Sequence, residues 1–367
     1  MVVDLGNSKK AVKKKKFIIR FVIILSLICV FFTSAAFSYN YVLRNQDDSL
    51  DKPLPVIPES KGIQFEVPRG ATSAQITDKL AEEGIIKNTF MFKMISKING
   101  FDGTYKSGTH ILSKDLDYDS LMRILSSDPV TSKVLIPEGY TLNQITDKLY
   151  KDKLIDKAKF ANVALNEKFD YKFLKGIPQR EKRLEGYLFP DTYNFDVKSG
   201  EKAIIDRMLS RFDEVFKPEY YEKAKALGLT VHEVIILASI IEREAKEYEE
   251  RRLISGVFYN RLKSKNPIHK KLQSCATIQY ILLNKTGEVK PKLTDADTKI
   301  NDPYNTYLHE GLPPGPICCP GKESIEAALE PETTDYYYFV SKGDGTHEFS
   351  TTLSQHQAAV KKYGLFN

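Results

Sequence analysis

One glutamate in the chain is placed as a general acid would be. The stretch LTVHEVIILASIIEREAKE, residues 229–247, predicts a helix. Thr230 and Glu233 have the spacing of a capping box that starts it. At about 100° per residue, Glu242 falls on the same apolar arc as Ile235. A carboxyl group held against apolar side chains resists ionisation, so we expect a raised pKa, as a proton donor near neutral pH requires.

The same pattern is also typical of a structural carboxylate. Glu242 could pair with a basic side chain such as Arg261 on the next predicted helix, because ion-pair networks also place carboxylates in cores. Ala238 and Ser239, one turn before Glu242, are small and would leave room for a substrate. Spacing alone leaves both interpretations open.

Three further motifs hold polar side chains among aromatic and turn residues. The aromatic residues of LEGYLFPDTY could stack against a sugar, and they are equally typical of a buried turn. The motif LQSCATI begins a predicted helix, where helix capping would explain its polar residues. The prolines and glycines of YNTYLHEGLPPGPI predict a rigid loop. Their candidate side chains are Glu185, Asp191, Gln273, Ser274, Thr277, Tyr304 and Asn305.

The net charge of +6 is confined to the N-terminus. The first 20 residues hold seven Lys or Arg and one Asp, and the remaining chain is balanced, which argues against a nucleic-acid surface. Phe21 to Leu43 contains no charged residue and is long enough to span a bilayer, which needs about 20 residues. The preceding lysines predict a cytoplasmic N-terminus and an extracytoplasmic remainder. A cleavable signal peptide is the alternative, because Ser34 and Ala36 offer a small-x-small site.

An internal repeat follows the predicted anchor. VPRGATSAQITDKL, from Val67, recurs as IPEGYTLNQITDKL, from Ile136. Each copy predicts a strand, a glycine turn and a helix opened by a capping Thr or Ser.

The predicted organisation is an α+β fold with an N-terminal transmembrane helix, a small α+β domain and a mixed catalytic domain. Helices are predicted for 200–216, 231–247, 249–263, 275–284 and 352–363, and a hairpin for 336–349. The segments are a basic tail (1–20), the anchor (21–43), a proline-rich linker (44–60), an α+β domain (61–130), the second repeat with its connection (131–179) and the catalytic domain (180–367).

The four cysteines give no disulfide framework, and no CxxC or HExxH metal spacing occurs. We expect buried or half-buried thiols. One bridge from Cys275 to Cys318 or Cys319 is the less favoured alternative.

Several motifs in one order resemble the endolytic murein transglycosylases, the MltG or YceG-like family. They are LEGYLFPDTY, LASIIEREA, FYNRL, LQSCATIQY, YNTYLHEGLPPGPI and YYYFVSKGDGTHEFSTTLSQH, and they cover nearly everything after the linker. The resemblance implies a LysM-like domain before the catalytic domain, and a catalytic role for the first Glu after LASI, which is Glu242. One departure stands at Cys318-Cys319-Pro320-Gly321, where a polar residue is expected before Pro-Gly, which puts a loop contact at Cys319 in doubt.

The resemblance also implies a reaction, a non-hydrolytic lyase cleavage of peptidoglycan. Glu242 would protonate the glycosidic oxygen between MurNAc and GlcNAc, then take the proton of the MurNAc C6 hydroxyl as a 1,6-anhydro ring closes. No cofactor and no metal ion is implied; penicillin-binding synthases are the implied partners. Glu185, Ser239, Gln273, Ser274, Thr277, Tyr304 and Asn305 are the expected substrate-site residues. The alternatives are a non-catalytic wall-binding scaffold and a muramidase with Asp191 or Glu185 as its second carboxylate.

Overall fold

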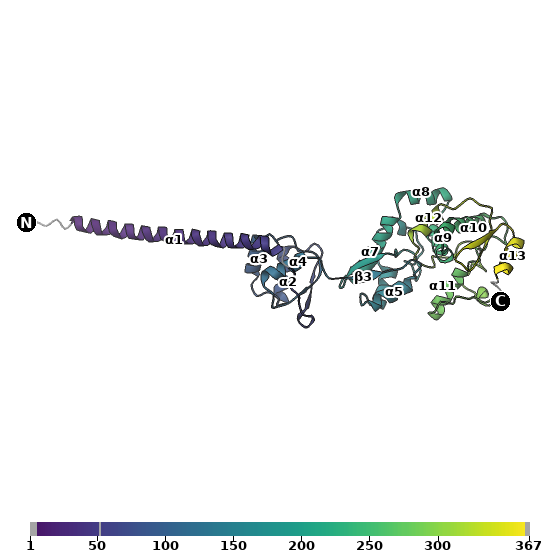
Figure 1. The fold of residues 1–367 in the computed structure, drawn as a ribbon, viewed down its shortest axis with the longest axis horizontal. Helices are drawn as coiled ribbons and strands as arrows, with labels where there is room; N and C mark the ends of the chain where they lie inside the picture. Colours follow the sequence, from purple (N-terminus) through teal and green to yellow (C-terminus); the bar gives the residue numbers. More distant parts are fainter. Residues whose placement is uncertain (1–5, 51–52, 364–367) are drawn as a thin grey trace, which may run out of the picture. The chain divides into compact units, whose positions relative to one another are not determined.

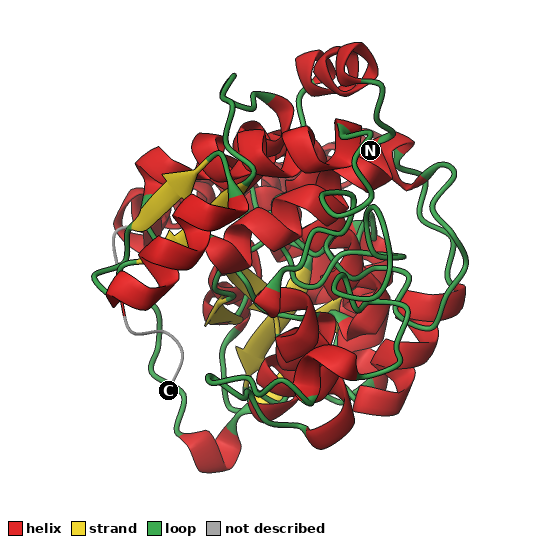
Figure 2. Ribbon diagram, turned by 90° about the vertical axis from the view of Figure 1, so that its right-hand side faces the viewer, coloured by secondary structure: helices red, strands yellow, loops and turns green. Residues whose placement is uncertain are grey.

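The computed structural model describes residues 6–50 and 53–363. Outside the described residues lie 1–5 of the predicted basic tail, 51–52 of the predicted linker and 364–367 of the predicted catalytic domain. The contacts divide the chain into two compact units, Met1–Val130 and Thr131–Asn367. Helices make up most of the structure and the strands are short (Figure 2). The α+β class predicted from the sequence is confirmed.

Helix α1 (Gly6–Leu50) is a single long helix (Figure 1). Within it Lys15–Ala36 is long and apolar enough to cross a membrane, and its side chains are exposed. This stretch begins and ends earlier than the predicted anchor of 21–43. The helix also includes 44–50, which we expected to be extended linker. The reason is that the first proline of the predicted linker is Pro53, so no residue before it blocks helical hydrogen bonding.

The first unit contains a β-α-α-β arrangement. Strands β1 (Ile63–Val67) and β2 (Gly108–Leu112) pair antiparallel, and α2 (Ser73–Glu82) and α3 (Thr89–Ile98) lie between them in sequence. Helix α4 (Tyr118–Ser126) follows. The apolar faces of these elements form one core, with fully buried side chains that include Phe65, Leu80, Phe92, Leu112 and Leu121.

The second unit begins with the same arrangement. Strand β3 (Thr131–Leu135) is followed by α5 (Leu142–Lys151) and α6 (Lys157–Asn166), and it pairs antiparallel with β4 (Thr192–Asp196). Because β4 comes from beyond residue 180, the expected boundary at 179/180 does not separate two compact units.

The two copies of the repeat have matching local geometry. Thr72 with Gln75 and Thr141 with Gln144 each form a complete capping box. The glycine turns before them have φ angles of 76° and 75°, a left-handed conformation that glycine adopts without strain. The predicted strand, glycine turn and capped helix are confirmed in both copies.

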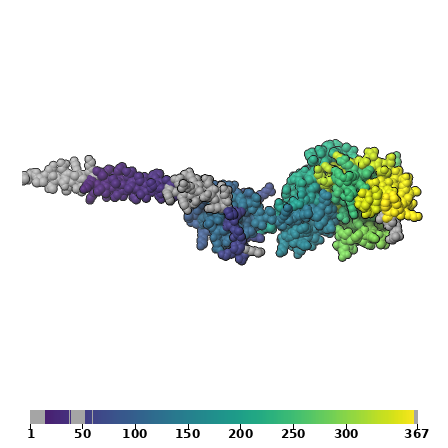
Figure 3. Space-filling view, viewed as in Figure 1, coloured from purple at the N-terminus to yellow at the C-terminus, as the bar shows by residue number. Residues whose placement is uncertain are grey.

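The remaining helices assemble around one core helix. Helix α9 (Val231–Glu244) is buried on every side over Val234–Ile241, and it packs against α8 (Pro218–Leu227), α10 (Arg251–Lys263), α11 (Cys275–Thr286) and α12 (Lys322–Leu329). Helix α7 (Gly200–Val215) packs against α6. The hairpin of β5 (Tyr338–Ser341) and β6 (His347–Ser350) and helix α13 (Leu353–Tyr363) gather at one end of this unit (Figure 3).

Candidate active site

Glu242 lies in the last turn of α9, where the helix meets the start of α12. Its side chain is 8% exposed. Its Oε2 atom accepts the Gly321 backbone N–H at 3.1 Å and the Ser324 hydroxyl at 2.8 Å. Gly321 is the N-cap residue of α12, so the carboxylate occupies the end of the helix where backbone N–H groups lack partners. Among the described residues, none donates a hydrogen bond to Oε1.

Arg251 is the cation nearest to Glu242. Its Nη2 atom lies 3.8 Å from Glu242 Oε1, beyond hydrogen-bond distance, and its Nη1 atom lies 3.9 Å from Glu323 Oε2. The alternative partner suggested by the sequence, Arg261, instead donates to the Leu272 carbonyl at 3.1 Å. Arg261, the example given for a structural ion pair, is therefore not the partner of Glu242, and Arg251 is the basic residue beside it.

Glu138 is a further carboxylate of this site, and the sequence reasoning did not select it. Glu138 is exposed as a residue, but its carboxyl group is partly surrounded by protein, and this partial burial raises its pKa. The negative charges of Glu242 and Glu323 raise the pKa further, and Arg251 lowers it. One guanidinium thus faces three carboxylates.

The turn of the second repeat lies directly against the loop before α12. The Gly139 N–H donates to the Cys319 carbonyl at 3.0 Å, and the Cys319 N–H donates to the Tyr140 carbonyl at 2.8 Å. A Cβ atom on Gly139 would lie 3.9 Å from Glu242 Cγ. The repeat therefore forms one wall of the Glu242 site.

Cys318 and Cys319, the departure from the expected motif, are fully buried and unpaired. The Cys318 thiol donates to the Ser239 carbonyl at 3.3 Å. Burial raises the pKa of both thiols. Because Cys319 holds the Gly139 turn through its backbone, this loop contact does not depend on a polar side chain.

Ser239 is fully buried beneath the same loop. Its hydroxyl donates to the Ile236 carbonyl at 2.7 Å and accepts the Ile317 N–H at 3.0 Å. The space that small residues were expected to leave for a substrate is occupied by the loop, and Ser239 positions that loop.

The LQSCATI residues gather at the start of α11. The Ser274 hydroxyl donates to Glu244, and the Thr277 hydroxyl lies 3.0 Å from that of Thr306. Burial raises the pKa of Glu244. Gln273 is exposed, has φ of 52°, and accepts a 2.6 Å hydrogen bond from Arg261. Of the three candidate side chains in this motif, Ser274 and Thr277 are buried and Gln273 is exposed.

Asn305 and Tyr304 hold the loop that precedes Ile317. The buried Asn305 amide donates to the Thr298 carbonyl at 3.0 Å and the Ile300 carbonyl at 2.8 Å. The Tyr304 hydroxyl accepts a hydrogen bond from Arg180. These contacts fix the loop.

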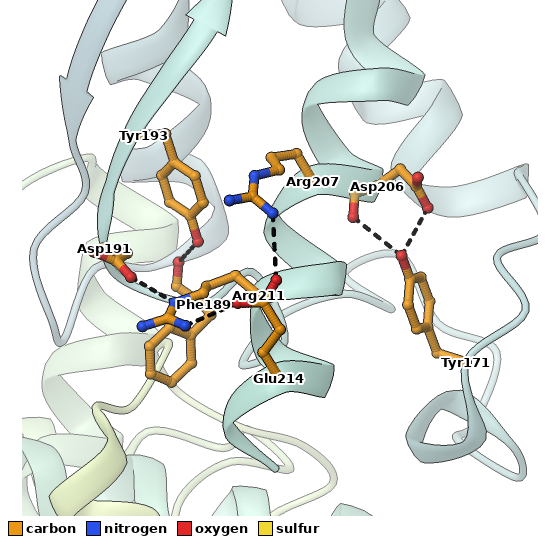
Figure 4. A network of polar contacts seen from close by, with 8 residues as sticks. All are labelled: Tyr171, Phe189, Asp191, Tyr193, Asp206, Arg207, Arg211 and Glu214. Carbon is orange, nitrogen blue, oxygen red and sulfur yellow. Dashed lines mark hydrogen bonds and ion pairs between the residues drawn. The ribbon is translucent and has the colours of Figure 1, made fainter. Parts of the chain in front are cut away.

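Neither carboxylate considered for a two-acid mechanism is free. Glu185 is fully buried; its Oε1 accepts the Leu142 N–H at 2.8 Å, and burial raises its pKa to about 7. Asp191 faces Arg211, with Oδ2 2.6 Å from Nε, and Arg211 also binds Glu214 (Figure 4).

A small pocket lies beside the last turn of α9. Gly139, Thr141 and Gln144 line one side of it. Its other lining residues are Arg243, Ala276, Gln279, Tyr280, Leu283, Val289 and Ile317. The second repeat and α11 thus form the walls of a depression at Arg243, the residue that follows Glu242 in the chain. Among the described residues, no group of His, Cys, Asp or Glu side chains has the arrangement of a metal site.

The fold and the site define an α+β protein in which Glu242, in the last turn of a core helix, accepts hydrogen bonds at the N-terminus of α12. The sequence matches the YceG-like family over residues 65–362. It is 33% identical to the endolytic murein transglycosylase of Bacillus subtilis, an alignment that covers 84% of this chain and 87% of that protein. The structure is also similar to the crystal structure of a YceG-like protein from Listeria monocytogenes, with a TM-score of 0.54 and 34% sequence identity. The match covers 82% of this chain and 99% of the Listeria chain.

The endolytic murein transglycosylase of Streptococcus pneumoniae strain D39 is also 33% identical, over 95% of this chain. This chain spans about two thirds (65%) of that relative's length. The chain belongs to the YceG-like family, which confirms the resemblance found in the sequence.

Proposed function

We propose that this chain is an endolytic peptidoglycan lytic transglycosylase, a lyase, with Glu242 as its single acid and base. The names of the S. pneumoniae and B. subtilis relatives support the activity. The observation that carries the proposal is the asymmetry of the Glu242 carboxyl. Oε2 is held by Gly321 and Ser324, and Oε1 has no hydrogen bond from the described residues. Oε1 is therefore the atom on which a transferable proton would sit.

The proposed reaction breaks the β-1,4 bond between MurNAc and GlcNAc. Glu242 donates its proton to the glycosidic oxygen as the bond to the MurNAc anomeric carbon breaks. The C6 hydroxyl of the same MurNAc then bonds to that carbon, and its proton returns to Glu242. The nucleophile is part of the substrate, so its attack gains from proximity and forms the 1,6-anhydro end.

A transglycosylase agrees better with the site than does a muramidase that uses Glu185 or Asp191 as its second carboxylate. Ordinary glycosidases need a second accessible carboxylate as nucleophile or base. Glu185 is fully buried, and Asp191 is ion-paired with Arg211. Gln273 and Tyr304 remain the proposed sugar contacts. Ser239, Ser274, Thr277, Asn305 and Glu185 are proposed to shape the loops around them.

The N-terminal half is proposed to deliver this site to nascent glycan. Lys15–Ala36 would anchor the chain, with the lysine-rich end in the cytoplasm and the second unit outside. The β-α-α-β unit of 63–112 is proposed to be LysM-like and to bind the wall. Cleavage close to the membrane would release strands from penicillin-binding synthases, the proposed partners.

Product analysis tests the proposal. The full-length protein in detergent is incubated with purified glycan strands, and the new ends are identified by mass spectrometry. We expect internal cleavage with anhydro-MurNAc ends. Reducing MurNAc ends would contradict the transglycosylase reaction, and no cleavage would favour a scaffold.

A further inference from the structure

We propose that Glu138 is a second catalytic carboxylate, which contacts the sugar at the scissile bond and stabilises positive charge on its anomeric carbon. This inference rests on the proposed function. Glu138 forms no covalent bond in it: the proton moves between Glu242 and the sugar oxygens, while the Glu138 charge remains in place. A fixed negative charge beside the anomeric carbon would favour the oxocarbenium-like transition state of glycosidic cleavage.

Glu138 and Glu242 flank the same residue. The Gly321 N–H donates to Glu242 at 3.1 Å, and a Cβ atom built on Gly321 would lie 2.0 Å from Glu138 Oε1. The Glu138 carboxylate therefore rests against the Gly321 backbone. Both acids belong to one site although they lie 104 positions apart in the chain.

Glu138 is the carboxylate of this site that remains open to a ligand. The residue is exposed, and within the described part of the chain no hydrogen bond or ion pair holds its carboxylate. By contrast, Glu185 accepts the Leu142 N–H and Glu244 accepts the Ser274 hydroxyl. An acceptor without a protein partner, next to the proposed acid, is available for a sugar hydroxyl or amide.

The repeat itself does not require an acid at this position. In the first copy the equivalent residue is Arg69, before a glycine with the same φ and a helix with the same capping box. The strand, turn and helix therefore form with either charge. A glutamate in the copy that borders Glu242 is explained by the site rather than by the fold.

Gly321 makes room for this carboxylate. Its φ of −72° and ψ of 171° are open to any residue, so its backbone does not demand glycine. The obstacle to a side chain at 321 is Glu138 itself. A methyl group there would displace the end of the flexible Glu138 side chain and leave the 321 N–H on Glu242.

The first experiment replaces Glu138 by its neutral isostere in the full-length protein. Glu138→Gln should lower kcat for anhydro-end formation about 100-fold, the scale of losing one electrostatic stabiliser, with KM changed less than about threefold and Tm unchanged. Glu222→Gln, at an exposed glutamate on α8 that has no hydrogen bond or ion pair among the described residues, is the control and should keep full activity. Glu138→Gln activity within threefold of the wild type would overturn the inference and leave the proposed function intact.

The products separate failure of the inference from failure of the function. Wild-type protein that yields reducing MurNAc ends, with that activity lost in Glu138→Gln, would make Glu138 a nucleophile or base and overturn the role proposed here. Wild-type protein that cleaves nothing would remove the proposed function and this inference with it.

A second experiment removes the Glu138 contact from the other side. Gly321→Ala should lower kcat about as much as Glu138→Ala, and the double variant should be no slower than Glu138→Ala alone, because both changes remove the same interaction. Multiplied losses in the double variant would contradict a shared mechanism. The Tm of each variant is measured to verify folding.

Discussion

The buried carboxylate of Glu185 accepts the backbone N–H of Leu142 at 2.8 Å, which joins the LEGYLFPD segment to the first turn of α5. The Tyr280 hydroxyl lies 3.2 Å from its other oxygen. Through this one side chain the second repeat, the motif segment and α11 are held together. The sequence analysis placed Glu185 among the expected substrate-site residues, and in the structure its contact supports the turn that borders Glu242.

Glu185 should make the stability of the second unit depend on pH. Burial raises its pKa from 4.5 to about 7, so the folded unit retains a proton that the unfolded chain loses. Stability should therefore fall as pH rises from about 4.5 to about 7 and then level off, by at most about 3 kcal/mol. Urea unfolding of wild type and Glu185→Gln across this range measures the effect.

Glu185→Gln should remove the contribution of residue 185 to the pH dependence of the free energy of unfolding. A Gln carbonyl can accept the Leu142 N–H and its amide can donate to Tyr280, so the difference in unfolding free energy between the variant and wild type should grow in favour of Gln with rising pH. A difference that stays constant from pH 4.5 to 7.5 would show that Glu185 does not titrate there.

Gly186 should tolerate no side chain. Its φ is +91°, and a Cβ atom would lie 2.6 Å from Pro316 Cβ and 3.0 Å from Ile235 Cγ2. Backbone strain and overpacking together should cost about 3 kcal/mol or more in Gly186→Ala. Gly200→Ala is the matched control, with φ of +72° and open space around the new methyl group, and should cost about 1 kcal/mol. Equal urea midpoints for the two variants would contradict the packing around Pro316.

Ser324 should matter for the rate of the reaction as well as for stability, because its hydroxyl orients the Glu242 carboxyl. Ser324→Ala removes the 2.8 Å donor to Glu242 Oε2 and leaves the Gly321 N–H in place. We expect a cost of about 1 kcal/mol in stability and about a tenfold loss in kcat, since the acid becomes less firmly oriented. The comparison is with Ser255→Ala, a buried serine on α10 whose hydroxyl has no partner among the described residues. Equal activity in the two variants would argue against an orienting role for Ser324.

Local signals in the sequence predicted the helices well. The capping box of Thr230 and Glu233 is formed as expected, and the five predicted helices of the second unit appear within three residues of their predicted ends. Capping and periodicity depend on near neighbours in the chain, so one sequence suffices. The amphipathic reading of α9 was incomplete, because Ile236 and Ile240 are buried as well. Burial on every side depends on four packed helices that the period of a single helix does not reveal.

Contacts between residues that are distant in the chain could not be predicted from the sequence. Arg251, rather than Arg261, approaches Glu242 because a short connection brings the start of α10 to the end of α9, whereas Arg261 lies about 15 Å further along the helix. Glu138 was missed because its nearness to Glu242 arises from the packing of the 319 loop against the 139 turn. The one available signal was the change from Arg69 to Glu138 between otherwise similar repeats.

The most direct test of the account compares Glu242→Gln with Glu233→Gln by mass spectrometry of released glycan. Both variants neutralise a glutamate on α9, and glutamine at 233 retains a capping box. Glu233→Gln should release anhydro-MurNAc ends at the wild-type rate, and Glu242→Gln should be slower by about 1,000-fold or more at an unchanged Tm. Anhydro ends formed by Glu242→Gln at the wild-type rate would contradict the claim that this carboxyl performs the chemistry.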